Sequence, residues 1–297
     1  MPAETMHAGE VPIDAALVRQ LLAAQFPEWA ALPIRAVRST GTVNAIYQLG
    51  DHLSARLPRV REWAQDLDKE WLWLPKLAPH LSLRVPTPVG KGRPEGSYPF
   101  SWAVYEWIDG QPYADELVDD ERRAAKDLAD FVVALRHIDP EIGAPRGGRQ
   151  PLRELDGVTR AAIAAARGII DSDAAIAAWE RALDAPAWNG APVWIHADLL
   201  RPNLLVHGGR LQAVIDFGSV GIGDPAADVI AAWSVFNQSG RRAFRDAVDV
   251  DDSAWNRARG VALHQAALII PYYSETNPGF VALAKRTVEE VLADINA

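Results

Sequence analysis

The sequence predicts an α+β fold in two parts: a small lobe built on an antiparallel sheet, and a larger, mostly helical lobe. Short apolar or alternating segments fall within the first 108 residues, and longer segments with helical spacing begin near residue 119. The chain has 297 residues, 49% of them hydrophobic, which is enough for two cores of moderate size. We therefore expect two domains, at residues 1–108 and 109–297.

The first lobe is expected to begin with a helix and to continue as a sheet. Asp14 can cap a helix that ends before Phe26-Pro27. Gly50-Asp51 is a hairpin signal between two strand-like segments. A helix is predicted from Glu62 to about Leu77, bent or ended by Pro75. The expected strands are 34–38, 43–49, 52–57, 87–91 and 100–107.

A break at Asp109-Gly110-Gln111-Pro112 separates this lobe from the second one. Beyond the break the apolar periodicity is mostly helical, except for three short strands expected around residues 193–216. The expected helices are 119–138, 152–168, 173–184, 225–237, 255–271 and 279–294.

Composition narrows the classes of partner and compartment. The 39 acidic and 30 basic residues give a net charge of −9, which disfavours nucleic acid or an anionic membrane surface and favours a cationic small molecule. Without cysteine there can be no disulfide, thiolate metal site or cysteine nucleophile. The first residues are unlike a signal peptide and no apolar run could cross a bilayer, so we expect a cytoplasmic protein. Both a monomer and a homodimer are compatible with the sequence.

One octapeptide, His196 to Asn203, predicts the chemistry. Its spacing, H-x-D-x-x-x-x-N, is followed after a short hairpin by Asp216-Phe217-Gly218, a combination typical of phosphoryl transfer. Asp198 is the expected catalytic base, because transfer to an alcohol needs a carboxylate near the attacking oxygen. Asn203 and Asp216 supply the hard oxygen ligands that Mg²⁺ prefers. His196 is expected to stiffen the loop through backbone hydrogen bonds rather than to transfer a proton.

The first lobe offers candidates for nucleotide binding. Thr42 and Asn44 belong to a Ser/Thr/Gly loop between strands that could lie over phosphates, although such a loop is more often only a hairpin. Ser54 and Arg56 share a strand face, and Arg56 stands where kinases usually have lysine. Glu70 on the following helix is its expected partner. Alternatively, both charges are solvated at the surface.

Two further segments refine the prediction. The backbone near Glu106 and Ile108, at the end of a strand between the lobes, is expected to bind a purine edge. Asp224 suits the start of a helix, and Asp228 inside its first turns can bond back to the catalytic loop. Only a few residues separate these aspartates from Gly218, which leaves no room for the activation loop of a protein kinase.

These motifs resemble the aminoglycoside phosphotransferases and their relatives, which share the protein-kinase-like fold. Ala197 stands where glycine is commoner in the family. The resemblance implies phosphorylation of a small-molecule hydroxyl with ATP or GTP, with Asp198 as base and with Asn203 and Asp216 on Mg²⁺. The matching segments are His196–Leu205, Val214–Gly218, Gly223–Asp228, Gly41–Asn44, Arg56–Arg59 and Tyr105–Gly110.

The acceptor is expected between the base and the C-terminal helices. An aminoglycoside-type antibiotic is favoured; the alternatives are a macrolide, a metabolic acceptor such as a sugar, choline or homoserine, or a non-catalytic nucleotide-binding pseudokinase. Acidic or aromatic side chains could contact an aminocyclitol, but such charges are more often solvated at the surface and such aromatics more often belong to the core. These candidates are Glu275, Asp171, Asp173, Trp233 and Trp188.

Overall fold

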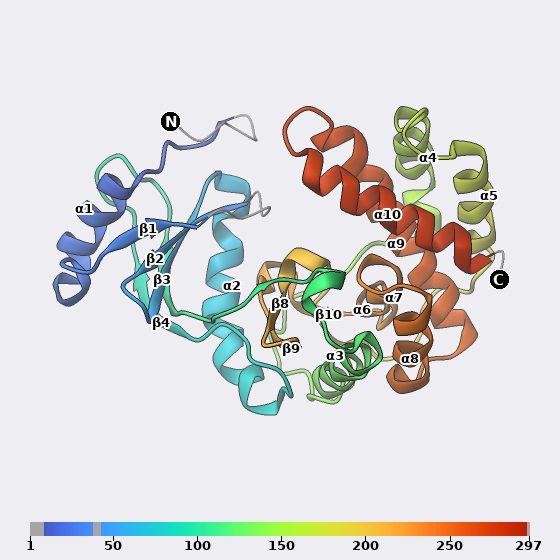
Figure 1. Ribbon diagram of the computed structural model, residues 1–297, viewed down its shortest axis with the longest axis horizontal. Helices are drawn as coiled ribbons and strands as arrows, with labels where there is room; N and C mark the ends of the chain where they lie inside the picture. Colours follow the sequence, from blue (N-terminus) through green and yellow to red (C-terminus); the bar gives the residue numbers. More distant parts are fainter. Residues whose placement is uncertain (1–8, 38–42, 296–297) are drawn as a thin grey trace.

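The computed structural model describes residues 9–37 and 43–295. A five-stranded sheet with two helices forms one part, and a larger helical assembly forms the other (Figure 1). This is the α+β architecture that the sequence predicts. Among the described residues, no helix combines the length and the apolarity needed to cross a bilayer.

The sheet is antiparallel throughout, with strand order β1-β2-β3-β5-β4. Side chains of β2 alternate between buried and partly buried, so alternate residues face a core closed by α1 (Ala15–Gln25). Asp14 caps α1 by accepting a hydrogen bond from the Leu17 N–H, as expected. The strands are β1 (Ile34–Ala36), β2 (Asn44–Leu49), β3 (Leu53–Pro58), β4 (Pro88–Gly92) and β5 (Trp102–Glu106).

Helix α2 (Arg61–Leu77) stands between the sheet and the helical part (Figure 1). It buries Leu67 and Leu74 in the larger core. The predicted helix from Glu62 to about Leu77 is confirmed, with Pro75 in its last turn. Pro75 lacks the N–H that would bond to the carbonyl four residues earlier, and burial of Leu74 and Leu77 offsets this loss.

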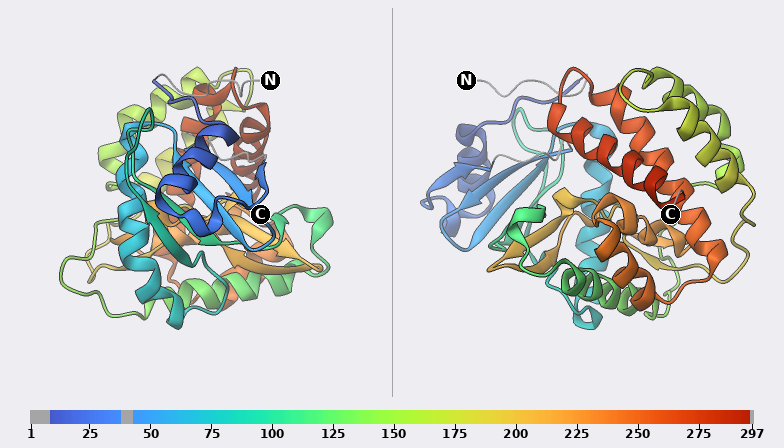
Figure 2. Two further views of the ribbon diagram at one scale, coloured as in Figure 1. Left: turned by 90° about the vertical axis from the view of Figure 1, so that its left-hand side faces the viewer. Right: turned by 45° about the vertical axis from the view of Figure 1, so that its right-hand side comes forward.

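The second part contains eight helices within the described ranges. Helices α9 and α10 pack against each other, and α4 and α5 lie on the side of α9 away from the sheet (Figure 2). Their bounds are α3 (Glu121–Arg136), α4 (Asp156–Ala165), α5 (Ser172–Leu183), α6 (Ala226–Val229), α7 (Ala231–Ser234), α8 (Gln238–Val248), α9 (Asp252–Tyr273) and α10 (Pro278–Ile295).

Two of these elements differ from the sequence prediction. The segment 225–237 is not one helix but two short ones, α6 and α7, in which bonds such as Trp233 N–H to Ile230 C=O span three residues. Helix α8 was not expected, because it opens with glutamine, serine, glycine and two arginines. Asn237 caps it, and Glu121 accepts hydrogen bonds from the Asn237 and Gly240 N–H groups, so tertiary contacts offset its weak propensity.

Five short strands connect the two parts and carry the motif. The sheets are β6-β8-β9 and β7-β10, both antiparallel. The hairpin of β8 and β9 brings the end of the His196–Asn203 loop next to the segment that precedes Asp216. The strands are β6 (Gln111–Pro112), β7 (Val193–Ile195), β8 (Leu204–His207), β9 (Arg210–Val214) and β10 (Gly221–Gly223); β6 and β10 were not predicted.

Candidate active site

The catalytic loop follows β7, and a buried carboxylate on α6 holds it in place. Asp228, 1% exposed, accepts hydrogen bonds from the His196 N–H at 2.8 Å and the Ala197 N–H at 2.7 Å. This confirms that Asp228 bonds back to the loop. Ala197 takes a left-handed conformation with φ of 67°, which costs a residue with a Cβ atom about 1–2 kcal/mol. The two bonds from Asp228 hold this strained turn.

His196 is fully buried and serves as a fixed spacer. The Asp198 N–H donates to His196 Nδ1 at 3.2 Å, so the proton must lie on Nε2, which donates to the Ile215 carbonyl at 3.1 Å. Burial lowers the pKa of His196, although the carboxylates of Asp228 and Asp216 oppose this effect. The predicted structural role of a neutral imidazole is confirmed.

The Asp198 carboxylate is held by two side-chain amides. Asn203 Nδ2 donates to Asp198 Oδ2 at 2.8 Å, and Gln265 Nε2 donates to Oδ1 at 2.7 Å. Burial raises the pKa of Asp198 to about 6, and the charge of Asp216 acts in the same direction; Gln265, Arg149 and Asn203 oppose them. A carboxylate oriented in this way, with a pKa near neutrality, is suited to accept a proton from a hydroxyl.

Asn203 and Asp216 fit a small, hard cation. Both amide hydrogens of Asn203 are used, one to the Asp198 backbone carbonyl at 2.9 Å and one to its carboxylate, which leaves Asn203 Oδ1 free as a ligand. Asp216 Oδ1 accepts from Arg56 Nη2 at 2.7 Å, and the Gly218 backbone also hydrogen-bonds the carboxylate. Burial acts against the charged form of Asp216, but Arg56 lowers its pKa below the usual value. Two protein oxygens beside an open cleft match the way Mg²⁺ is bound.

Arg56, on β3, contacts both Glu70 on α2 and Asp216, the candidate metal ligand. Its Nη1 lies 2.8 Å from both carboxylate oxygens of Glu70, so the predicted ion pair is confirmed. Tyr105 donates a further hydrogen bond to Glu70 at 3.0 Å. With the Asn44 amide turned so that its oxygen faces the guanidinium, Asn44 accepts from Nε at 2.9 Å and from Nη2 at 2.8 Å. Arg56 is therefore neutralised by protein groups on several sides.

These residues line one cleft between the sheet and the second part. The cleft has a volume of about 210 Å³. Asn44, Ser54, Arg56, Glu106, Ile108, Asn203 and Asp216 all line it. Thr42 lies outside the described residues.

The hinge between the parts offers one free donor. The Glu106 N–H donates to the Thr87 carbonyl and the Trp107 N–H to the His52 carbonyl, both within the protein. In the described part of the chain, the Ile108 N–H has no backbone partner. Of the two hinge positions predicted to bind a purine edge, Ile108 is therefore the one with an available N–H.

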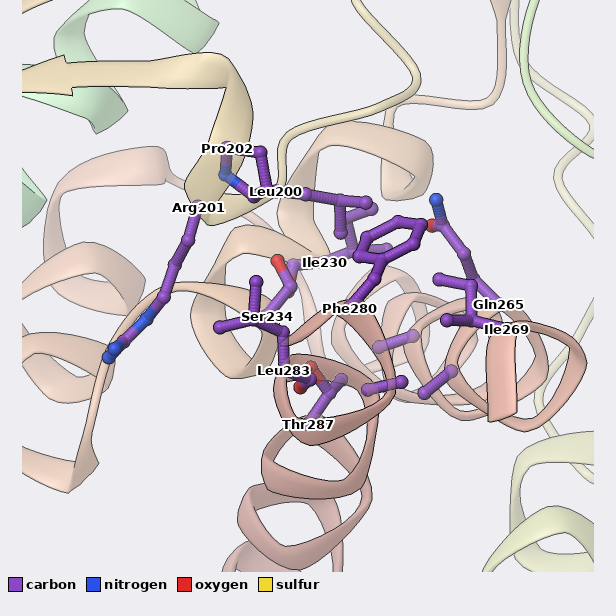
Figure 3. Close-up of a pocket in the computed structure, with 13 residues that line it drawn as sticks. Leu200, Arg201, Pro202, Ile230, Ser234, Gln265, Ile269, Phe280, Leu283 and Thr287 are labelled. Atoms are coloured by element: carbon purple, nitrogen blue, oxygen red, sulfur yellow. Dashed lines mark hydrogen bonds between the residues drawn. The ribbon is translucent and has the colours of Figure 1, made fainter. Parts of the chain in front are cut away.

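The expected acceptor contacts are mostly elsewhere. Trp233 is fully buried in the core, and Asp171 caps α5. Asp173 is almost fully exposed and lies 4.0 Å from Arg167. Instead, Gln265 reaches Asp198 from α9, beside a small apolar pocket under Leu200 and Phe280 (Figure 3). A single glutamine in an apolar helix carries no spacing signal, so sequence reasoning missed it.

A basic loop also approaches the base. Gly147 donates to the Ile222 carbonyl on β10, and a Cβ atom on Gly221 would lie 2.5 Å from the Gly147 nitrogen, so the two backbones are in close contact. Arg149 follows two residues later. It is exposed, and no carboxylate of the described residues lies within ion-pair distance of it. Its positive charge lowers the pKa of Asp198, against the larger effect of burial.

Comparison with known proteins agrees with this geometry. Residues 35–261 match the phosphotransferase enzyme family, which covers most of the chain. The chain belongs to this family. It is 25% identical over 200 residues to YcbJ of Bacillus subtilis (strain 168), an uncharacterized protein; the match spans 62% of this chain and 63% of YcbJ.

Solved structures share the fold over nearly the whole chain. The GDP and kanamycin complex of APH(2")-IIIa has a TM-score of 0.73 at 19% identity, with 94% of this chain and 99% of that one covered. The macrolide 2'-phosphotransferase MphH from Brachybacterium faecium has a TM-score of 0.57 at 21% identity, with coverage of 92% and 97%. The predicted protein-kinase-like fold is confirmed.

Proposed function

We propose that this protein is a small-molecule kinase that transfers the γ-phosphate of ATP or GTP to a hydroxyl of an antibiotic-like acceptor, with an aminoglycoside as the first candidate. The main support is the Asp198 carboxylate, oriented by Gln265 and by Asn203, which lines the cleft together with Asp216. The structural neighbour solved with GDP and kanamycin supports a nucleotide as phosphate donor and an aminoglycoside as acceptor.

In the proposed reaction, Asp198 orients the acceptor hydroxyl and takes its proton as the oxygen attacks the γ-phosphorus. The bond from that phosphorus to the β–γ bridging oxygen breaks, and the nucleoside diphosphate leaves with the electron pair. Asn203 Oδ1 and the Asp216 carboxylate would hold Mg²⁺, which when bound neutralises phosphate charge. Arg56 keeps Asp216 in place and faces the nucleotide cleft.

A second candidate, a macrolide or metabolic acceptor with fewer positive charges, is favoured by the local charge near the base. The pocket beside Gln265 is lined by apolar and neutral side chains and by Arg201, without an aspartate or glutamate among its described residues. Arg149 adds a positive charge that is close enough to Asp198 to lower the pKa of its carboxyl group. A polycation would be expected to meet several carboxylates there, so the net charge of −9 does not by itself favour an aminoglycoside.

An acceptor panel tests the proposal. Purified protein with Mg²⁺ and either ATP or GTP is incubated with kanamycin, gentamicin, erythromycin, choline, homoserine or a free sugar, and diphosphate release is followed. We expect release that depends on one acceptor class, with a phosphate ester in the product by ³¹P NMR. Mg²⁺-dependent nucleotide binding in calorimetry without any acceptor-dependent release would instead support the pseudokinase. Absence of nucleotide binding would contradict both proposals.

A further inference from the structure

The Asp198 carboxylate accepts hydrogen bonds from side chains of two separate structural elements. Asn203 comes from the catalytic loop itself, whereas Gln265 comes from α9, 67 residues further along the chain. An ionised carboxylate can only accept hydrogen bonds, so both amide nitrogens must face it. Because the two donors bind different oxygens, together they fix the rotation of the carboxylate about its Cβ–Cγ bond, which neither could do alone.

Gln265 is itself held rigidly. Its side chain is 7% exposed on a helix whose neighbouring His264 is anchored to α4. Thr159 Oγ donates its proton to the Leu155 carbonyl at 2.7 Å, so His264 Nδ1 must be the donor in its 2.8 Å contact with Thr159. This bond joins α9 to α4 one residue before Gln265. The amide that reaches Asp198 is therefore part of a fixed scaffold, as accurate positioning requires.

The amide of Gln265 has further hydrogen-bonding capacity. It uses one hydrogen for Asp198, and the described residues provide no other partner for its second hydrogen or for Oε1. These groups lie beside the apolar pocket under Leu200 and the ring of Phe280 (Figure 3). That pocket has a volume of about 20 Å³, enough for about one water molecule. The pocket is therefore too small to hold an acceptor.

We propose that Gln265 is a positioning residue for Asp198 and that its unused amide atoms bind a polar group next to the acceptor hydroxyl. This inference rests on the proposed kinase function. One side of the amide fixes the base, and the other contacts the substituent adjacent to the reacting oxygen. The preferred acceptors then carry two neighbouring polar groups, as in a vicinal diol or an amino alcohol, whereas an isolated hydroxyl on an apolar molecule is a poor substrate.

The positioning role is tested first without any acceptor. Crystal structures are compared for the wild type, Gln265→Leu and the control Asn256→Leu, which alters an α9 amide whose one hydrogen-bond partner among the described residues is Arg259. We expect the Asp198 carboxylate to turn away or to occupy two orientations in Gln265→Leu, which cannot donate a hydrogen bond, and to be unchanged in the control. An Asp198 carboxylate in its wild-type orientation in Gln265→Leu would overturn the positioning role, whatever the enzyme phosphorylates.

Kinetics with those members of the acceptor panel that are turned over test both roles. Loss of orientation should lower kcat in Gln265→Leu by about 10- to 100-fold, and loss of one acceptor hydrogen bond should raise the acceptor KM about 5-fold. Nucleotide KM should stay within about 2-fold, because Gln265 does not line the nucleotide cleft. An unchanged kcat would overturn the positioning role, and an unchanged acceptor KM would overturn the acceptor contact. If no panel member is turned over, the proposed function fails, while the crystal structures still decide whether Gln265 positions Asp198.

Discussion

The two walls that meet at Asp198 are built from different chemistry. The wall proposed for the nucleotide is a network of charges in which Arg56 contacts Glu70 and Asp216. The wall proposed for the acceptor is mostly neutral, with the Gln265 amide beside apolar side chains of α9 and α10. The solved structures that share this fold include both aminoglycoside and macrolide phosphotransferases, so the acceptor differs among them. A charged wall for the phosphates facing a neutral wall for the acceptor is a physical basis for that difference.

Within the first wall, the largest expected effect comes from removing the charge of Asp216. Asp216→Ala should reduce turnover by about a thousandfold, because a metal ion lost from the phosphates removes several kcal/mol of transition-state stabilisation. Steady-state kinetics at saturating Mg²⁺ measures it. Asp130→Ala, which removes a surface carboxylate paired with Lys126, is the control and should be neutral. Turnover within about tenfold of the wild type would show that Asp216 does not hold the metal.

The same wall should also stabilise the fold through its buried ion pair. Glu70 is fully buried, so Glu70→Ala leaves the Arg56 guanidinium without its bidentate partner and should lower the free energy of unfolding by about 3 kcal/mol. Denaturant unfolding measures the change. Glu62→Ala, at an exposed position in the first turn of the same helix, should stay within about 0.5 kcal/mol of the wild type. Equal effects of the two substitutions would mean that the pair adds nothing to stability.

These two walls also differ in how far the sequence predicted them. Asp198, Asn203 and Asp216 follow from fixed spacing, because a short hairpin leaves the loop and the second motif only one arrangement. Arg56 and Glu70 follow from strand and helix faces. The nucleotide-binding and metal-binding roles of these residues remain predictions. Gln265 could not be predicted, because its contact depends on how α9 packs after helices α6 to α8, and one of those helices was itself missed.

The pH dependence of kcat/KM should follow the ionisation of Asp198, the residue at which the two walls meet. With a pKa of about 6, Asp198 is ionised above that pH, so kcat/KM should rise with pH and level off above about 6. It should fall as the carboxylate is protonated below that value. Arg149→Ala removes a positive charge that favours the ionised form, so the acidic limb should move to higher pH, whereas Arg149→Lys should leave it in place. A flat profile between about pH 5 and pH 7 would contradict a base with this pKa.

The smallest expected effect is on the free energy of unfolding and comes from the strained turn at Ala197, next to Asp198. Ala197 has a φ of 67°, so Ala197→Gly should raise the free energy of unfolding by about 1 kcal/mol by relieving the Cβ contact. Ala213→Gly, in the extended backbone of β9, should instead destabilise the protein, because glycine there adds freedom to the unfolded chain and removes a buried methyl group. Thermal or denaturant unfolding of both variants gives the comparison. Destabilisation by Ala197→Gly would mean that the turn is not strained.

The central claim is that Asp198 acts as the base for transfer to a small-molecule hydroxyl, and Asp198→Asn tests it most directly. Asparagine keeps the size of the side chain but cannot take a proton. Nucleotide binding by calorimetry and acceptor phosphorylation by ³¹P NMR are measured on the same preparation. The account predicts normal Mg²⁺-dependent nucleotide binding, with phosphorylation reduced by a factor of about 100 to 10,000. Phosphorylation at a rate close to that of the wild type would contradict it.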